Sequence, residues 1–272
     1  MPELPEVETT VRGLAQVLQG RTLTRVEPRR EDLRRPIPHD LGQRMTGATV
    51  VGLRRRAKYG LIDTNRGDTL VFHLGMSGRW RVDPVDLGKH DHLIVETGEG
   101  RVVALNDPRR FGSLDLMPTT DVADWGAFAG LGPEPLGNAI SGQWLKERLA
   151  GRSAAVKLLL LDQRIVAGLG NIYVCEALFR AGIDPRKAGG KVSRAKLDLL
   201  AQTIPAVLDE VIAAGGSTLR DFAAPDGELG YFSKRFDAYD REGEPCTNGC
   251  GGTVGRIVQG GRSTFFCPKC QK

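Results

Sequence analysis

The spacing of hydrophobic residues changes twice along this chain. Apolar residues first recur at helical spacing from Val7 to Leu18, so this segment is predicted to be an amphipathic helix that ends before Gly20. From about residue 21 to 117 the pattern becomes one of short apolar runs bounded by Gly, Asp and Asn, which is typical of strands in a β-sandwich or barrel. The expected strands are Thr49–Leu53, Gly60–Thr64, Thr69–Leu74, His92–Thr97, Val102–Asn106 and Ser113–Met117.

A helical pattern follows the strand-rich half. Residues 131–137 are rich in Gly and Pro and form the best linker candidate. The expected helices after it are Ser141–Leu149, Ser153–Leu161, Asn171–Ala181 and Ser193–Ala213. Pro205 predicts a kink in the last of these, and Gly215-Gly216 predicts its end. Residues 224–230 have the composition of a mobile loop.

Four of the five cysteines lie in the last 27 residues, as a Cys-x3-Cys pair and a Cys-x2-Cys pair separated by 16 residues. Four thiolates in two close pairs suit tetrahedral zinc and leave no open coordination position, so one structural zinc is predicted. Thr253–Ile257 and Ser263–Phe266 alternate like strands around a Gly260-Gly261 turn, which predicts a zinc ribbon. The expected ligands are Cys246, Cys250, Cys267 and Cys270. Cys175 lies alone in an apolar run and is predicted to be a buried helix residue.

Length, charge and the N-terminus narrow the class of protein. A chain of 272 residues predicts about two domains. The N-terminus has no apolar signal core and no run of 18 apolar residues occurs, so we expect a cytosolic protein with no membrane span. The net charge of +5 is gathered in clusters such as Arg54-Arg55-Arg56, which indicates either a nucleic-acid partner or a solvated basic face.

The first eight residues carry a candidate nucleophile. Removal of Met1 would leave Pro2 as a free secondary amine, and such an amine titrates near about 7.7–8, so much of it is nucleophilic at neutral pH. A secondary amine that attacks a sugar aldehyde carbon gives an iminium, which can act as an electron sink. The alternative is that Pro2 begins a helix whose dipole is complemented by Glu3, Glu6 and Glu8.

Several loops have the composition of nucleic-acid contacts, and each has a purely structural alternative. Gly168-Leu169-Gly170-Asn171 precedes a helix and either exposes backbone N–H groups to a phosphate or forms a plain turn. Segments 73–78 and 107–112 each carry one apolar wedge, Met76 or Phe111, beside cations, although either wedge could be core packing. Lys58 is either a phosphate contact or simply exposed. His90-Asp91-His92 suggests a metal site, but histidines at this spacing are more often structural.

Taken in order, these motifs resemble the bacterial formamidopyrimidine-DNA glycosylase family, whose members excise 8-oxoguanine and ring-opened purines. The resemblance covers essentially the whole chain. It is carried by residues 2–8, 55–59, 73–78, 89–92, 107–112, 131–136, 168–173 and 227–232 and by the terminal ribbon. The endonuclease VIII branch is less similar, because it usually opens Pro-Glu-Gly-Pro-Glu and lacks the Arg-Arg-Phe arrangement. The Cys-x3-Cys spacing departs from the family's usual Cys-x2-Cys, and Gly249 is placed to absorb the extra residue.

The resemblance implies an α+β multidomain fold. Residues 1–130 would be an N-terminal helix plus β-sandwich, 131–223 a helix–two-turn–helix module, 224–237 a lesion-capping loop and linker, and 238–272 the zinc ribbon. The implied activity is that of a DNA glycosylase and abasic-site lyase in base-excision repair. The implied partner is duplex DNA that contains oxidised purines or abasic sites. A monomer in the bacterial cytoplasm, associated with the nucleoid through DNA, is expected.

The resemblance also implies roles for individual residues. Pro2 would attack C1′ and form a Schiff base, Glu3 would move protons at the sugar, and Lys58 and Arg262 would assist β- and δ-elimination. The implied DNA contacts are His73, Met76, His90, Arg109, Phe111, Lys157 and Asn171, with Arg109 on the opposite cytosine. Glu6 and Tyr231 would lie at the lesion, and the 226–231 loop would cover the damaged base.

Two other functions are compatible with the same residues. A non-enzymatic zinc-ribbon protein could bind DNA with no use for Pro2 and Glu3, and it would leave abasic DNA intact. An endonuclease VIII-type glycosylase would prefer oxidised pyrimidines.

Overall fold

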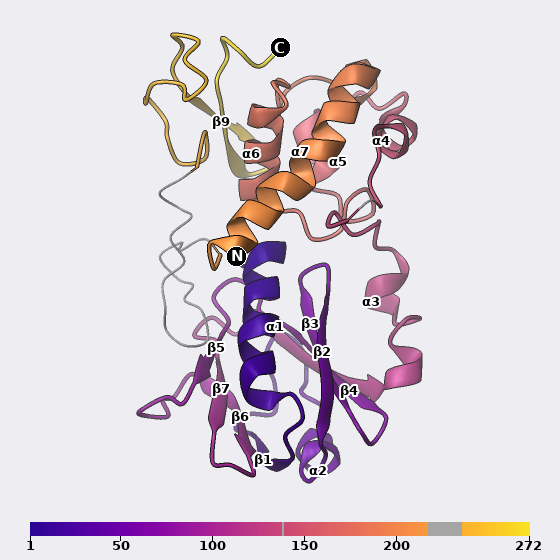
Figure 1. Cartoon of the computed structure of the whole chain (residues 1–272), viewed down its shortest axis with the longest axis vertical. Helices are drawn as coiled ribbons and strands as arrows, with labels where there is room; N and C mark the ends of the chain where they lie inside the picture. The colour runs from indigo at the N-terminus through magenta and orange to yellow at the C-terminus, as the bar shows by residue number, and fades with distance from the viewer. Residues whose placement is uncertain (138, 217–235) are drawn as a thin grey trace. The chain divides into compact units, whose positions relative to one another are not determined.

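The computed structural model describes residues 1–137, 139–216 and 236–272. The chain divides into two compact units, the first built on Met1–Ala129 and the second on Gly130–Val211 with residues 236–272 (Figure 1). No helix in the described part of the chain is long and apolar enough to span a bilayer.

The first helix, α1 (Leu4–Leu18), begins three residues earlier than predicted. Glu3 is its N-cap and forms a capping box with Glu6, whose Oε2 accepts the backbone N–H of Glu3 at 2.9 Å. Pro5 lies in the first turn, where its missing N–H costs no helical hydrogen bond. The predicted apolar stripe is confirmed, because Val7, Leu14 and the other stripe residues are buried. The helix contacts strands of both sheets of this unit.

In the described residues, the strands of the first unit pair into two four-stranded antiparallel sheets, of order β1-β6-β7-β5 and β2-β3-β4-β8. Apolar side chains from both sheets and from α1 form a single core. The predicted β-sandwich is therefore confirmed. The strands are β1 (Leu23–Pro28), β2 (Val50–Arg56), β3 (Tyr59–Thr64), β4 (Asp68–His73), β5 (Arg79–Val82), β6 (Asp91–Thr97), β7 (Val102–Asn106) and β8 (Ser113–Pro118).

Two of these strands, β1 and β5, were not among the predicted apolar runs. Both carry charged residues; β5 has only four residues and reads Arg79-Trp80-Arg81-Val82, with only Trp80 fully buried. Their apolar residues join the core, but each strand is recognised only with its pairing partner, β6 for β1 and β7 for β5. Short helical segments, α2 (Leu41–Met45), η1 (Thr119–Asp121) and α3 (Gly126–Ala129), complete the described part of this unit outside α7.

Two loops cross between the sheets at the same end of the sandwich. Residues 74–78, which we call the first wedge loop, run from β4 to β5, and residues 107–112, the second wedge loop, run from β7 to β8. Ladder pairs flank both crossings: His73 lies opposite Ser113 in one sheet, and Arg79 lies opposite Asn106 in the other. The two wedge loops are thus held side by side by the register of both sheets.

The second unit is helical and ends in a β-hairpin. Its helices are α4 (Gly142–Leu149), α5 (Val156–Leu160), α6 (Asn171–Arg180), η2 (Gly189–Lys191) and most of α7 (Arg194–Ala213). Helix α7 continues through Pro205. Cys175 is buried in α6, as predicted. The hairpin consists of β9 (Gly255–Gln259) and β10 (Arg262–Phe266), joined at Gly260 and Gly261, which have φ of +54° and +72°. These left-handed angles suit glycine in a tight turn.

Candidate active site and nucleic-acid interface

The start of α1 places a buried N-terminal segment beside two buried carboxylates. Pro2 is buried, and Glu3 and Glu6 are only 3% and 2% exposed. Met1, still attached, is 41% exposed. If Glu3 and Glu6 only complemented the dipole of α1, they would not need to be buried, because solvated carboxylates would serve that purpose equally well. The capping box supplies hydrogen bonds that offset the cost of burying these carboxylates. Two buried carboxylates beside a buried Pro2 make this segment a candidate for chemistry.

Lys58 lies in a strained turn between β2 and β3 and is only 8% exposed, so the alternative of a simply exposed lysine is wrong. The preceding residue, Ala57, has φ of +52°, a conformation that non-glycine residues rarely adopt. Arg55 stabilises the turn, since its guanidinium donates to the Ala57 carbonyl at 3.0 Å and to Glu8 of α1 at 2.9 Å. The turn is therefore anchored to the helix that carries the N-terminal segment.

His73, at the end of β4, is neutral and lies among cations. Burial, and after it the positive charges of Lys58, Arg34 and Arg35, together lower its pKa to about 4. Its Nδ1 accepts the backbone N–H of Gly75 at 3.0 Å, so the ring proton is on Nε2. A neutral imidazole donor surrounded by cations is suited to binding an anion such as phosphate.

The wedge loops expose the apolar side chains that the sequence singled out. Met76 is 37% exposed and Phe111 is 44% exposed, so the core-packing alternative is wrong for both. The guanidinium carbon of Arg109 lies 4.8 Å from the centroid of the Phe111 ring. A cation stacked on an exposed aromatic ring is a recurrent nucleic-acid recognition element.

His90 and His92 differ in their environments. His92 is buried, and its Nε2 donates to the Asp107 carbonyl at 2.9 Å, which is a structural role. His90 is partly exposed in the turn before β6. Among the described residues, the only group of His, Cys, Asp and Glu that could hold a metal is the set of four cysteines, so the structure does not support a metal site at these histidines.

The second unit brings together residues that are far apart in the sequence. Lys157 Nζ and Asn171 Nδ2 point to the same acceptor, the Ser263 carbonyl of β10, at 3.4 and 2.9 Å. Lys157 is fully buried, and its hydrogen bond to Ser263 joins it to the backbone of the ribbon. Arg262, the residue before Ser263, is exposed at the start of β10. This arrangement fixes the backbone beside Arg262.

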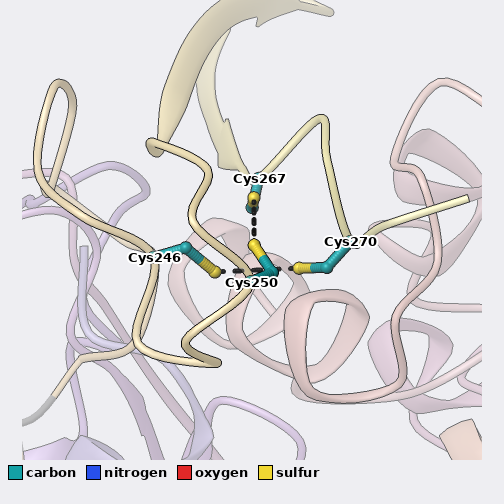
Figure 2. A group of neighbouring side chains, drawn as sticks. All are labelled: Cys246, Cys250, Cys267 and Cys270. Atoms are coloured by element: carbon teal, nitrogen blue, oxygen red, sulfur yellow. Dashed lines mark hydrogen bonds between the residues drawn. The ribbon is translucent and has the colours of Figure 1, made fainter.

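The four predicted cysteine ligands converge in Figure 2. The Sγ atoms of Cys246 and Cys270 are 3.7 Å apart, those of Cys250 and Cys267 are 3.6 Å apart, and all four lie within 4.8 Å of one another. A tetrahedron with Zn–S bonds of about 2.3 Å has sulfurs about 3.8 Å apart, so the cluster fits zinc. Gly249 has φ of +64°, which allows the chain to turn within the longer Cys-x3-Cys spacing.

Sequence reasoning missed two buried carboxylates. Glu176 of α6 is fully buried and accepts the backbone N–H groups of Asp237, Ala238 and Tyr239 at 2.7–3.0 Å. Burial raises the pKa of Glu176, and these backbone hydrogen bonds oppose the shift. In the sequence, the feature that points to Glu176 is a single acidic residue within the apolar run of α6. The second is Asp107, also fully buried. The predicted lesion residue Tyr231 and the 226–230 loop lie outside the described residues.

Three family models match consecutive parts of the chain. The formamidopyrimidine-DNA glycosylase N-terminal domain matches residues 1–114, the formamidopyrimidine-DNA glycosylase H2TH domain matches 131–223, and a zinc finger found in FPG and IleRS matches 243–272. Formamidopyrimidine-DNA glycosylases of Novosphingobium aromaticivorans and Rhizorhabdus wittichii are 68% and 64% identical over 272 residues, which is the full length of both sequences in each pair.

The chain belongs to the formamidopyrimidine-DNA glycosylase family. Solved structures agree with this assignment. A Lactococcus lactis Fpg in complex with abasic-site DNA has a TM-score of 0.91 at 33% identity, with both chains fully covered. The MutM (Fpg) protein of Thermus thermophilus has a TM-score of 0.88 at 38% identity, covering 99% of this chain and 98% of its own.

Membership in the formamidopyrimidine-DNA glycosylase family confirms several predictions. The chain is a DNA glycosylase of DNA repair, which excludes a purely non-enzymatic ribbon protein. The predicted three-part fold is confirmed, and so is the cysteine site for one structural zinc. The domain boundaries and the roles of individual residues stay predictions.

Proposed function

We propose that this enzyme removes oxidised purines from duplex DNA and then cleaves the strand, using Pro2 as a covalent nucleophile. The observation that carries the proposal is the buried Pro2-Glu3 segment at the start of α1, in a chain that resembles glycosylases over its full length. The substrates proposed are 8-oxoguanine and formamidopyrimidines. In support, the Lactococcus lactis Fpg was solved with abasic-site DNA, and a mutant of the same protein was solved with DNA that contains Fapy-dG.

In the proposed reaction, the Pro2 nitrogen lone pair forms a bond to C1′ while the bond from C1′ to the base breaks, and the base leaves with that electron pair and takes up a proton. The Pro2 nitrogen, now bonded to C1′, gives up its own proton, which balances the one taken up by the base. Its lone pair then forms a double bond to C1′ as the C1′–O4′ bond breaks, and Glu3 gives a proton to O4′, which leaves an iminium between Pro2 and C1′. The iminium acidifies the C2′ hydrogen because it accepts the electron pair that the departing proton leaves behind.

Strand cleavage follows from that acidity. Loss of the C2′ proton breaks the C3′–O bond, and a second elimination breaks the C5′–O bond, so each side of the gap ends in a phosphate. Hydrolysis of the remaining Schiff base returns the Pro2 amine. Lys58 and Arg262 are proposed to hold the phosphates and assist the β- and δ-eliminations. Their proposed roles agree with the buried turn at Lys58 and the exposed position of Arg262. Zinc holds the ribbon that carries Arg262.

The remaining predicted residues, some in each of the two units, are proposed to take part in DNA binding. His73, His90, Lys157 and Asn171 are proposed to contribute to phosphate binding, with Met76, Arg109 and Phe111 filling the space of the displaced base. Glu6 and Tyr231 are proposed to lie at the lesion. The protein is proposed to act as a monomer in the bacterial cytoplasm.

Cleavage of two matched duplexes tests the substrate class. One carries 8-oxoguanine opposite cytosine, the other thymine glycol opposite adenine in the same sequence. We expect preferential cleavage of the first, with phosphate at both ends of the gap. Preferential cleavage of the thymine glycol duplex would instead support the endonuclease VIII-type alternative, and a single elimination product would contradict the proposed second elimination.

A further inference from the structure

Asp107 has a buried carboxylate at the point where the two wedge loops cross between the sheets. It follows Asn106, the last residue of β7, and it is fully buried. Its Oδ1 accepts the Ser77 hydroxyl of the first wedge loop at 2.9 Å. Its Oδ2 accepts the Gly112 backbone N–H of the second wedge loop at 2.8 Å. One carboxylate therefore links the loop of Met76 to the loop of Phe111.

The backbone of Asp107 is fixed as firmly as its side chain. Its N–H donates to the His90 carbonyl at 2.9 Å. Its carbonyl accepts from His92 Nε2 at 2.9 Å and from the Arg110 backbone N–H at 3.2 Å. The bonds to His90 and His92 hold the residue to β6 and to the turn before it, so the carboxylate has a fixed position from which to hold the two loops.

The two wedge loops also touch backbone to backbone. Gly75 has φ of +62°, and a Cβ at this position would lie 2.3 Å from the Phe111 carbonyl carbon and 2.5 Å from the Gly112 nitrogen. A Cβ on Gly112 would lie 2.8 Å from the His73 carbonyl oxygen. Movement of either loop therefore displaces the other, provided that the hydrogen bonds across them persist.

We propose that Asp107 is a positioning residue that makes the two wedge loops one rigid unit, so that Met76 and Phe111 enter the DNA together. The inference rests on the proposed function for the identity of the wedges, but the linkage itself depends only on the contacts above. Without the carboxylate, Ser77 and Gly112 lose their common acceptor. The loops then move independently, and insertion of both wedges requires ordering them again.

The linkage is tested first on the protein alone, by amide hydrogen exchange. In Asp107→Ala, exchange in residues 74–78 and 109–112 is expected to rise together by about 10-fold or more, since hydrogen bonds to a charged acceptor are lost. Ser77→Ala, a milder variant that removes one link, is expected to raise exchange mainly in the first loop. Asp83→Gly is the matched control, because Asp83 also accepts a backbone N–H, from Val102 at 2.9 Å, away from both loops, and glycine tolerates the φ of +42° found there. Unchanged exchange in both loops of Asp107→Ala, or of Ser77→Ala if Asp107→Ala does not fold, would overturn the proposal.

Asp107→Asn separates hydrogen bonding from charge. The amide has the same shape, and its oxygen can accept from Gly112 while its nitrogen donates to the Ser77 oxygen. We therefore expect Asp107→Asn to keep both loops protected from amide hydrogen exchange and to function almost normally. Exchange as fast as in Asp107→Ala would contradict the linkage.

The functional consequence is tested with 2-aminopurine beside a stable abasic analogue. Asp107→Ala should slow the fluorescence rise that reports base unstacking by about 10-fold on an intact duplex, and much less on a duplex already opened by mismatches. An equal loss on both duplexes would overturn the positioning role. Failure of the wild-type protein to cleave any lesion would reject the proposed function instead, and the exchange result would still stand.

Discussion

The Nδ1 atom of His73 accepts the backbone N–H of Gly75, so a single imidazole connects the end of β4 to the first wedge loop. Protonation of that nitrogen would break the bond and add a charge beside Lys58. Burial of the ring, and after it the neighbouring positive charges, lower the pKa of His73 to about 4. The pH dependence of stability should therefore report on this residue.

We predict that His73 makes the folded protein sensitive to mild acid. Its pKa when folded is below the unfolded value of 6.5, so the unfolded chain binds the proton more tightly between these values. This contribution is fully present above pH 6.5 and is lost as the pH falls towards 4; it amounts to about 2 kcal/mol between about pH 8 and pH 5. Urea unfolding of the wild type and of His73→Asn, whose amide oxygen can still accept from Gly75, measures it. An equal pH slope in both proteins would contradict the assignment.

We predict that Glu3→Gln binds lesion DNA but fails to excise the base. The amide preserves the size of the N-cap side chain at the start of α1 but cannot give up or take up the proton, so excision should fall by about 100-fold or more. Binding by fluorescence anisotropy and single-turnover excision of 8-oxoguanine separate the two effects. Normal excision by Glu3→Gln would remove Glu3 from the mechanism. An unchanged melting temperature controls for loss of the cap.

We predict that Arg109→Ala weakens discrimination for cytosine opposite the lesion more than it weakens total affinity. A base contact carries specificity, whereas phosphate contacts weaken binding to all sequences alike. Arg110→Gly is the matched control: it removes the same charge from the neighbouring residue, and glycine tolerates the φ of +58° found there. Binding constants with each of the four opposite bases decide the matter. The same ranking in Arg109→Ala as in the wild type would count against Arg109 as the base reader.

We predict that removal of zinc abolishes DNA binding while the first unit stays folded. The ribbon has a small apolar core around its cysteines, so most of its folding free energy must come from the metal. Chelated protein should lose affinity for a lesion duplex and regain it when zinc is added, with amide exchange in residues 1–129 unchanged throughout. Cys175→Ala should keep one zinc per chain, because Cys175 lies outside the cysteine cluster. Normal binding by the metal-free protein would show that the ribbon is dispensable.

The sequence predicted most of this fold because its strongest patterns are local. The stripe of α1, the central strands and the paired cysteines need only the residues within each element, and Val102–Asn106 was predicted with its observed bounds. Strand β5 has only four residues, so its alternation is too brief to be recognised without its partner β7, which no local pattern supplies. For the same reason, the convergence of Lys157 and Asn171 on Ser263, and of two loops on Asp107, could not be inferred before the fold was known.

The central claim, that Pro2 is the nucleophile, also predicts that the chain acts only after Met1 is removed. While Met1 is attached, the Pro2 nitrogen belongs to a tertiary amide whose lone pair is delocalised into the carbonyl, so it cannot form an iminium. The chain that keeps Met1 should therefore be inactive.

Borohydride trapping on an 8-oxoguanine duplex, followed by mass spectrometry of the cross-linked peptide, tests this claim most directly. We expect the reduced sugar to be attached to a peptide that begins at Pro2, and the trapped protein to lack Met1. A cross-link on the peptide that contains Lys58, or full trapping of protein that retains Met1, would contradict the account.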